Sequence, residues 1–286
     1  MQKVAVVTDS IACLTSEQAE EHGIMVMPLN FYHGGKLYRD WVDVTPSEAY
    51  EMFLQDPESF KTSAVSPGEV LDAFREAGKL AESILCITIS SGLSGVYNAA
   101  RNARNLIINQ FPELKIEVLD SLACTAAQGF IVLAAARAAA EGRNLVEVTA
   151  VARDMMKRVK FAIFLDTIRY VYRSGRIPKI ASQVGSALNV KPLLTMAPSG
   201  LLHFAGVARS QKKGLERILG DMRKELGTKS AHVAVMHAYA PEKAEQLRGQ
   251  IASELCCSEL WITEFSPLMG YACGTGALGV AYYHDD

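Results

Sequence analysis

Apolar residues fall into short runs that alternate with amphipathic stretches over the first 157 residues. The runs have the length of buried strands, and the stretches repeat apolar residues at helical spacing, as from Val96 to Ile107. The expected strands are residues 3–7, 24–29, 84–89 and 115–119, and the expected helices include 96–107, 125–140 and 145–159. This alternation predicts an α/β fold, with a parallel sheet covered by helices in a three-layer domain.

The order of elements is less regular after residue 157. Two apolar runs, 191–196 and 201–206, flank Pro198-Ser199-Gly200 and predict a β-hairpin. Further helices are expected at residues 210–226 and 241–255, and further strands at 161–165, 232–237, 260–265 and 278–283. We therefore predict two domains, an α/β domain at residues 1–157 and an α+β domain at residues 158–286.

Three helix starts are marked by a hydroxyl residue and, three positions later, a glutamine or glutamate. Thr15 with Gln18 is one such pair, and Thr45 and Ser66 each precede a proline and then a glutamate. These patterns are capping boxes, two of them with proline at the first helical position. The hydroxyl-rich segment 61–65 between the second and third helix is expected to be a loop.

The turn between the strand at 84–89 and the next helix is made of serines and glycines, Ser90-Ser91-Gly92-Leu93-Ser94-Gly95. Ser94 is expected to be the N-cap of that helix. The first N–H groups of a helix have no partner within it and favour negative charge, so this turn suits a carboxylate or phosphate. A capped connection without a ligand is the alternative. Thr8-Asp9-Ser10 follows another strand, where open α/β sheets place ligands.

Composition and charge exclude several classes of protein. The 286 residues are 49% hydrophobic and 21% charged with a net charge of −2, which gives no reason to expect a nucleic-acid surface. We expect no signal peptide and no transmembrane segment, and a cytoplasmic location. The six cysteines form no CxxC pair, and no His, Cys, Asp and Glu grouping has the spacing of a metal site. We expect no metal and no cofactor.

Other motifs leave alternatives open. Gly92-Leu93-Ser94-Gly95-Val96 resembles a nucleophile elbow but has its second glycine one position early, and no P-loop is present. Residues 270–276 form a second glycine-rich segment, expected to be a loop near a ligand or a tight turn. The arginine-containing run at 166–176 is either a solvated helix face or a docking surface.

Taken together, the chain resembles the DegV family of bacterial fatty-acid-binding proteins. The matching stretches follow in order along nearly the whole chain: residues 8–10, 62–63, 66–68, 90–95, 118–121, 166–177, 188–192 and 274–279. This resemblance implies a two-domain protein that holds one long-chain fatty acid, such as palmitate or stearate. The carboxylate would lie at the domain junction, and the acyl chain in a tunnel between the domains and into the second domain.

The resemblance also assigns roles to residues. The family's carboxylate ligands correspond to Thr62 and Ser94, supported by Ser63 and the backbone at Gly95. The family usually carries a histidine in the last glycine-rich segment. This chain has Ala272 there, next to Cys273, which can substitute only as a weak donor.

The resemblance further implies a carrier without catalysis of its own, which presents the acid to a separate ATP-dependent kinase subunit for acyl-phosphate formation. We expect a monomer or weak dimer. The tunnel candidates are Ile168, Leu188, Leu193, Met196, Phe204, Met269 and Leu278, and the candidates for kinase docking are Arg173, Arg176 and Arg209. The alternatives are a lipid or ester hydrolase that uses Ser94, and a binding protein for another anionic metabolite.

Overall fold

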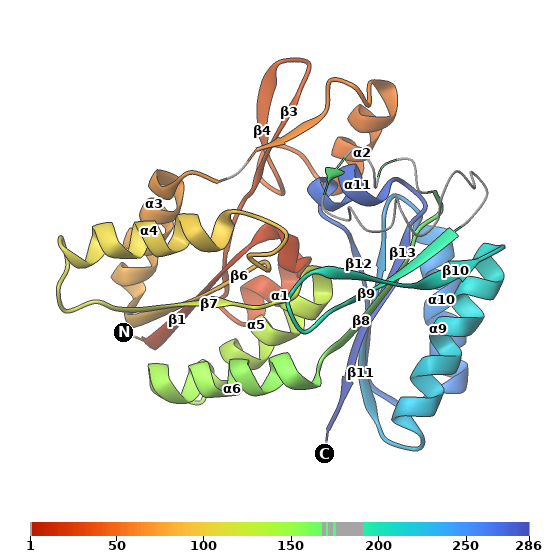
Figure 1. The fold of residues 1–286 in the computed structure, drawn as a ribbon. Coiled ribbons are helices and arrows are strands. Elements are labelled where there is room, and N and C mark those ends of the chain that lie inside the picture. The colour runs from red at the N-terminus through yellow and green to blue at the C-terminus, as the bar shows by residue number, and fades with distance from the viewer. Residues whose placement is uncertain (1, 64, 168–169, 171–173, 176–190, 286) are drawn as a thin grey trace.

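The N-terminal half contains a four-stranded parallel sheet in the order β2-β1-β6-β7 (Figure 1). The computed structural model describes residues 2–63, 65–167, 170, 174–175 and 191–285. The strands are β1 (Gln2–Asp9), β2 (Met25–Met27), β6 (Ala81–Thr88) and β7 (Lys115–Asp120). Each crossover carries a helix, as the alternating pattern predicts, because parallel neighbours need a long connection.

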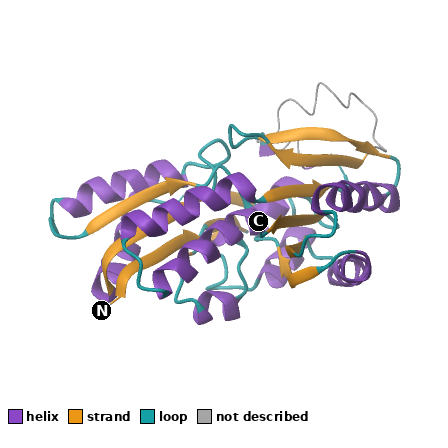
Figure 2. Ribbon diagram, turned by 90° about the horizontal axis from the view of Figure 1, so that it is seen from below, coloured by secondary structure: helices purple, strands orange, loops and turns teal. Residues whose placement is uncertain are grey.

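Helices cover both faces of this sheet (Figures 1 and 2). One face carries α3 (Pro67–Leu80) and α4 (Val96–Ile108), and the other carries α5 (Thr125–Ala140) and α6 (Leu145–Arg158). The short η1 (Ser10–Ala12) and α1 (Ser16–Glu21) follow β1. The three-layer prediction is therefore confirmed.

The C-terminal half contains a six-stranded mixed sheet in the order β10-β9-β8-β13-β11-β12. Its strand pairs are antiparallel except for β11 and β12. The strands are β8 (Lys160–Phe164), β9 (Lys191–Met196), β10 (Leu202–Ala208), β11 (Ala231–His237), β12 (Cys257–Glu264) and β13 (Leu278–His284), and the helices include α9 (Gln211–Leu226) and α10 (Pro241–Glu254). The predicted hairpin is formed by β9 and β10.

Side chains alternate between the two faces of this second sheet. On β8, Phe161 and Ile163 belong to the apolar core that includes the first sheet, whereas Phe164 packs in the core beneath α9 and α10. The second sheet therefore joins the two halves through one of its faces. The division at 157/158, within the last turn of α6, stays a prediction.

A third, smaller sheet lies beside the first. It has the order β4-β3-β5 and consists of β3 (Asn30–His33), β4 (Lys36–Arg39) and β5 (Lys61–Ser63), next to α2 (Pro46–Gln55). The prediction of a loop at residues 61–65 is thus wrong for 61–63. Phe60 stacks on Phe31 with ring centroids 4.7 Å apart, and this contact aligns the segment with β3.

The predicted capping boxes at Thr15, Thr45 and Ser66 are all present. Two other predictions are wrong. Gly95, not Ser94, is the N-cap of α4, because the Ser94 N–H donates to Ser90 O at 3.1 Å and keeps Ser94 in the preceding turn. The glycine-rich segment 270–276 is helical up to Cys273, in α11 (Pro267–Cys273), which Ser266 caps.

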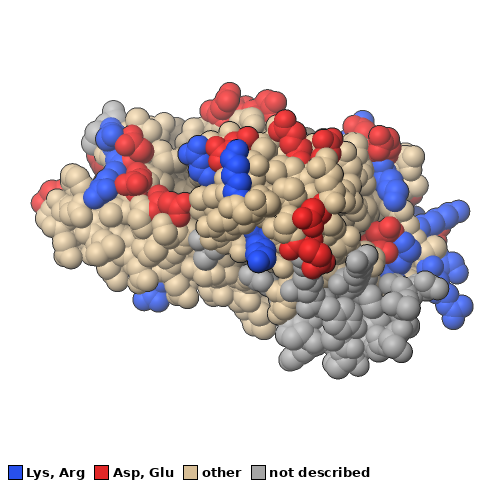
Figure 3. Space-filling model, turned by 90° about the horizontal axis from the view of Figure 1, so that it is seen from above, with Lys and Arg blue, Asp and Glu red and all other residues tan. Residues whose placement is uncertain are grey.

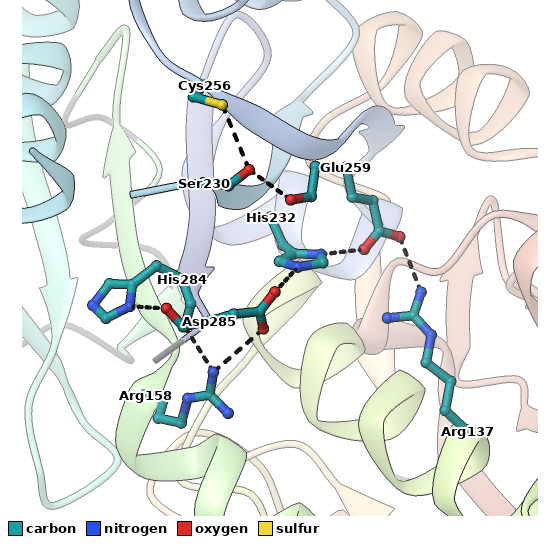
Figure 4. A network of polar contacts seen from close by, with 9 residues as sticks. Arg137, Arg158, Ser230, His232, Cys256, Glu259, His284 and Asp285 are labelled. Carbon is teal, nitrogen blue, oxygen red and sulfur yellow. Dashed lines mark hydrogen bonds and ion pairs between the residues drawn. The ribbon is translucent and has the colours of Figure 1, made fainter. Parts of the chain in front are cut away.

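A polar network links the end of the second sheet to the helices of the first half (Figure 4). His232 on β11 lies between Glu259 Oε2 at 2.9 Å and Asp285 Oδ2 at 3.0 Å. Arg137 of α5 pairs with Glu259 at 3.1 Å, and Arg158 of α6 lies 3.6 Å from Asp285. These contacts fix α5 and α6 against β11, β12 and the end of the chain.

Candidate functional site

A cavity of about 130 Å³ lies between the first sheet, the small sheet and α11. It is lined by all six residues expected around a head group: Thr62, Ser63, Ser94, Gly95, Ala272 and Cys273. The first pair lies on β5, the second on the turn between β6 and α4, and the third on α11. The structure therefore brings together residues that are up to 211 positions apart in the sequence. Their role as ligands stays a prediction.

The turn before α4 places the start of that helix beside the cavity, while the N–H groups of residues 90–94 are bonded within the protein. It is anchored by Ser90, which is fully buried and donates to Gly200 O at 2.7 Å and accepts from the Gly92 N–H at 3.2 Å. Gly95 has no side chain with which to cap α4. The N–H groups in the first turn of a helix have no acceptor within the helix, so those of α4 are available to a ligand.

Most of the remaining wall is apolar. Beyond the six predicted residues, the described lining consists of Ile11, Leu29, Ile89, Leu93, Ser174, Leu202, Leu268, Met269 and Tyr271. Ser174 and Tyr271 also line the cavity but were not among the predicted site residues. Tyr271 could have been found from Ser266-Pro267, since a capping serine followed by proline is typical of a helix start and would have placed 270–273 on a helix.

None of the described residues that line the cavity is a lysine, arginine, histidine, aspartate or glutamate. Burial raises the pKa of the Cys273 thiol to about 12, so the thiol stays protonated at neutral pH. A carboxylate in this cavity would be held by neutral donors, namely hydroxyl and N–H groups. None of these lining residues can act as a general base to activate Ser94 as a nucleophile. Within the described part of the chain, no group of side chains could hold a metal ion.

The seven tunnel candidates do not share one location. Met269 lines the head-group cavity, whereas Leu193 and Met196 line a separate cavity of about 780 Å³ beside α6 and α9. Leu278 is fully buried beneath α9 and α10, and Phe204 packs against the core of the first half. Ile168 and Leu188 lie outside the described residues.

The proposed docking arginines are only partly described. Arg209 is exposed between β10 and α9, whereas Arg173 and Arg176 lie outside the described residues. On the face shown in Figure 3, basic and acidic side chains are interspersed. Among the described residues, no helix is long and apolar enough to cross a membrane.

Thr8-Asp9-Ser10 lies behind the cavity and not in its wall. Asp9 is fully buried and accepts hydrogen bonds from the N–H groups of Ile11 at 3.1 Å and Ile89 at 2.7 Å. Burial outweighs these bonds and raises the pKa of Asp9 to about 6. Asp9 therefore contacts two residues of the cavity wall, and it lines a separate cavity of about 250 Å³.

Asp40 is a second fully buried carboxyl behind the wall. Its Oδ2 accepts a hydrogen bond from Ser266 Oγ at 2.6 Å, at the start of α11, and its N–H donates to Leu29 O at 2.9 Å. Burial raises the pKa of Asp40 to about 7, although the hydroxyls of Ser266 and Ser10 lower it in part. Asp40 thus connects two segments of the cavity wall, one through Leu29 and one through α11.

Comparison with known proteins shows the family. The family model described as "Uncharacterised protein, DegV family" matches residues 3–285. The chain belongs to the DegV family. A DegV domain-containing protein of Caldanaerobacter subterraneus is 31% identical over 284 residues, which cover 99% of each chain.

Solved structures of DegV proteins have the same fold. A DegV family protein from Thermus thermophilus, described by its fatty acid binding, has a TM-score of 0.89 and 29% identity, with 100% of both chains covered. A stearic acid-binding protein from Eubacterium ventriosum has a TM-score of 0.89 and 25% identity, with 99% of this chain and 98% of that chain covered. These similarities confirm the predicted α/β fold with its second, mixed-sheet domain.

Proposed function

We propose that this DegV protein binds one long-chain fatty acid and holds its carboxylate in the cavity beside Ser94. The observation that carries the proposal is the composition of the cavity: hydroxyl groups and a helix N-terminus in an otherwise apolar wall, with no cation among its described residues. A carboxylate is satisfied by such donors, and the apolar wall favours the methylene groups that follow it, at roughly 0.8 kcal/mol for each buried methylene. The fatty acids bound by the two structural relatives support this choice of ligand.

The size of the cavity supports its proposed role as the site of the head group. Sites that enclose a whole small-molecule ligand usually measure roughly 300–1,000 Å³, so a cavity of about 130 Å³ is matched to a carboxylate and the first methylene groups. Met269 and Leu202 would contact the start of the acyl chain. The course of the rest of the chain, through a tunnel that includes Ile168 and Leu188, remains part of the proposal.

The test is fatty-acid binding by the Thr62→Ala and Ser94→Ala variants, singly and together. A hydrogen bond to a charged group contributes roughly 1.5–3 kcal/mol, so each change should weaken binding about tenfold or more. Ser91→Ala is the matched control, because Ser91 is exposed on the same turn and does not line the cavity. Unchanged affinity in the double variant would refute the assignment of the site.

We further propose that the protein presents the bound acid to a separate ATP-using kinase and has no catalysis of its own. The lack of a base among the described residues of the cavity wall supports a passive role. Charge reversal at Arg209, compared with reversal at the exposed Arg101 on α4, should abolish acyl-phosphate formation in an extract supplied with ATP while lipid binding persists. Acyl phosphate trapped as a hydroxamate at the wild-type level would exclude Arg209 from the docking surface.

A further inference from the structure

Two carboxyl groups lie directly behind the wall of a cavity that is proposed to take an anion. Asp9 bonds to the N–H groups of Ile11 and Ile89, both of which line the cavity. Asp40 bonds to the backbone of Leu29, another lining residue, and to Ser266, whose helix supplies one side of the wall. The Asp9 carboxyl therefore contacts two residues of the cavity wall directly, and the Asp40 carboxyl contacts the wall through the start of α11, since its bond to Leu29 uses its backbone N–H.

No positive charge separates these carboxyls from the cavity among the described residues. The hydrogen bonds to Asp9 and Asp40 come from N–H groups and neutral side chains. The titratable groups packed against them are Cys13, Cys86, Cys124 and Tyr50. The exposed Glu20 of α1 also lines a separate cavity of about 250 Å³ together with Asp9 and Asp40. Burial raises the pKa of the three cysteine thiols and of the Tyr50 hydroxyl, so these four groups are neutral near pH 7.

We propose that Asp9 and Asp40 couple ligand binding to a proton, so that the protein takes up a proton when an anionic head group enters the cavity. This inference rests on the proposed function. Two negative charges in a poorly screened interior repel each other, and the ligand's charge favours the neutral form of each carboxyl. By reciprocity, the ionised form of either carboxyl weakens binding of the anion.

The buried positions of the two groups set the pH range. Burial raises the pKa of Asp9 to about 6 and that of Asp40 to about 7, so both change charge close to neutrality. Affinity for an anion should therefore fall as pH rises through this range. The decrease should be roughly tenfold for each pKa unit by which the bound anion raises the pKa of a carboxyl.

The experiment measures binding of hexadecyl sulfonate, whose head group stays ionised throughout, by calorimetry from about pH 5 to about pH 8 in two buffers of different ionisation enthalpy. Wild-type protein should bind more weakly at the higher pH and should take up protons on binding. The asparagine in Asp40→Asn keeps an acceptor oxygen for Ser266 but cannot ionise. This variant should therefore lose the part of the pH dependence of affinity that occurs near pH 7. The exposed Asp43→Asn is the matched control and should behave as wild type.

The outcomes separate this inference from the proposed function. Binding with equal affinity at every pH and without proton uptake would overturn the coupling while the binding site stands. Unchanged proton uptake in Asp40→Asn would overturn the role of Asp40. A wild-type protein that binds neither the sulfonate nor palmitate at any pH would overturn the proposed function and the inference with it.

Discussion

Replacing Asp40 by asparagine should stabilise the protein at alkaline pH and leave it nearly unchanged at acid pH. In the unfolded chain this carboxyl ionises near its ordinary pKa of 3.8, whereas burial raises the pKa to about 7 in the folded protein. Between these values the folded state binds more protons than the unfolded state, so stability falls as pH rises. The fall ends above about pH 7, where both states are ionised.

The expected magnitude follows from the two pKa values. Their difference corresponds to about 4 kcal/mol at about 1.36 kcal/mol per pKa unit, of which about 3 kcal/mol develops between pH 5 and pH 8. The introduced asparagine resembles the neutral carboxyl of Asp40, because it is uncharged and keeps an oxygen that accepts from Ser266. Relative to wild type, the variant should therefore gain about 3 kcal/mol of unfolding free energy over this range.

The assay is urea unfolding of both proteins at about pH 5 and about pH 8 at constant ionic strength, with the variant compared with wild type at each pH. Ionisation of Asp9 lowers the unfolding free energy of both proteins as pH rises, so this contribution cancels when the variant is compared with wild type. The matched control is Asp43→Asn: Asp43 is exposed, and its hydrogen bonds with Arg39 lower its pKa. A difference between Asp40→Asn and wild type that is the same at both pH values would refute the reasoning, because Asp40 would then have no raised pKa.

Three further changes test packing and polar contacts by urea unfolding. Gly270→Ala should destabilise by about 1–3 kcal/mol, because the added Cβ would lie 2.1 Å from the Tyr50 ring; an unchanged midpoint would contradict the close approach. Ser90→Ala should lose about 1–3 kcal/mol by leaving the buried Gly200 carbonyl without its donor, and Ser91→Ala should lose little. His232→Ala should lose a similar amount, since it removes two carboxylate contacts from the network in Figure 4; equal stability would show that those contacts are dispensable.

Features encoded within a few residues were predictable from the sequence. The capping boxes at Thr15, Thr45 and Ser66 depend on side chains three positions apart, and all are present. Strand and helix alternation likewise predicted the parallel sheet and its two layers of helices. The first helical residue of α4, Val96, was predicted correctly, but its N-cap was misplaced by one residue. Ser94 is held by the preceding turn, through a backbone bond to Ser90 that the residue types do not reveal.

Features that depend on distant partners were not predictable from local pattern. The strand at residues 61–63 forms only because it pairs with β3, and its sequence is as polar as a loop. The clustering of Thr62, Ser94 and Ala272 came from resemblance to a family and not from spacing. The burial of Asp9 and Asp40 was likewise not predictable, because aspartate is usually exposed and its residue type does not indicate whether folding will bury it.

The central claim is that the cavity beside Ser94 holds the carboxylate of a long-chain fatty acid. Mass spectrometry of an organic extract of the purified protein tests it most directly, with the Thr62→Ala, Ser94→Ala double variant extracted in parallel. The account predicts one equivalent of a long-chain fatty acid from wild type and much less from the variant. A wild-type protein that is empty and also fails to take up added palmitate or stearate would contradict it.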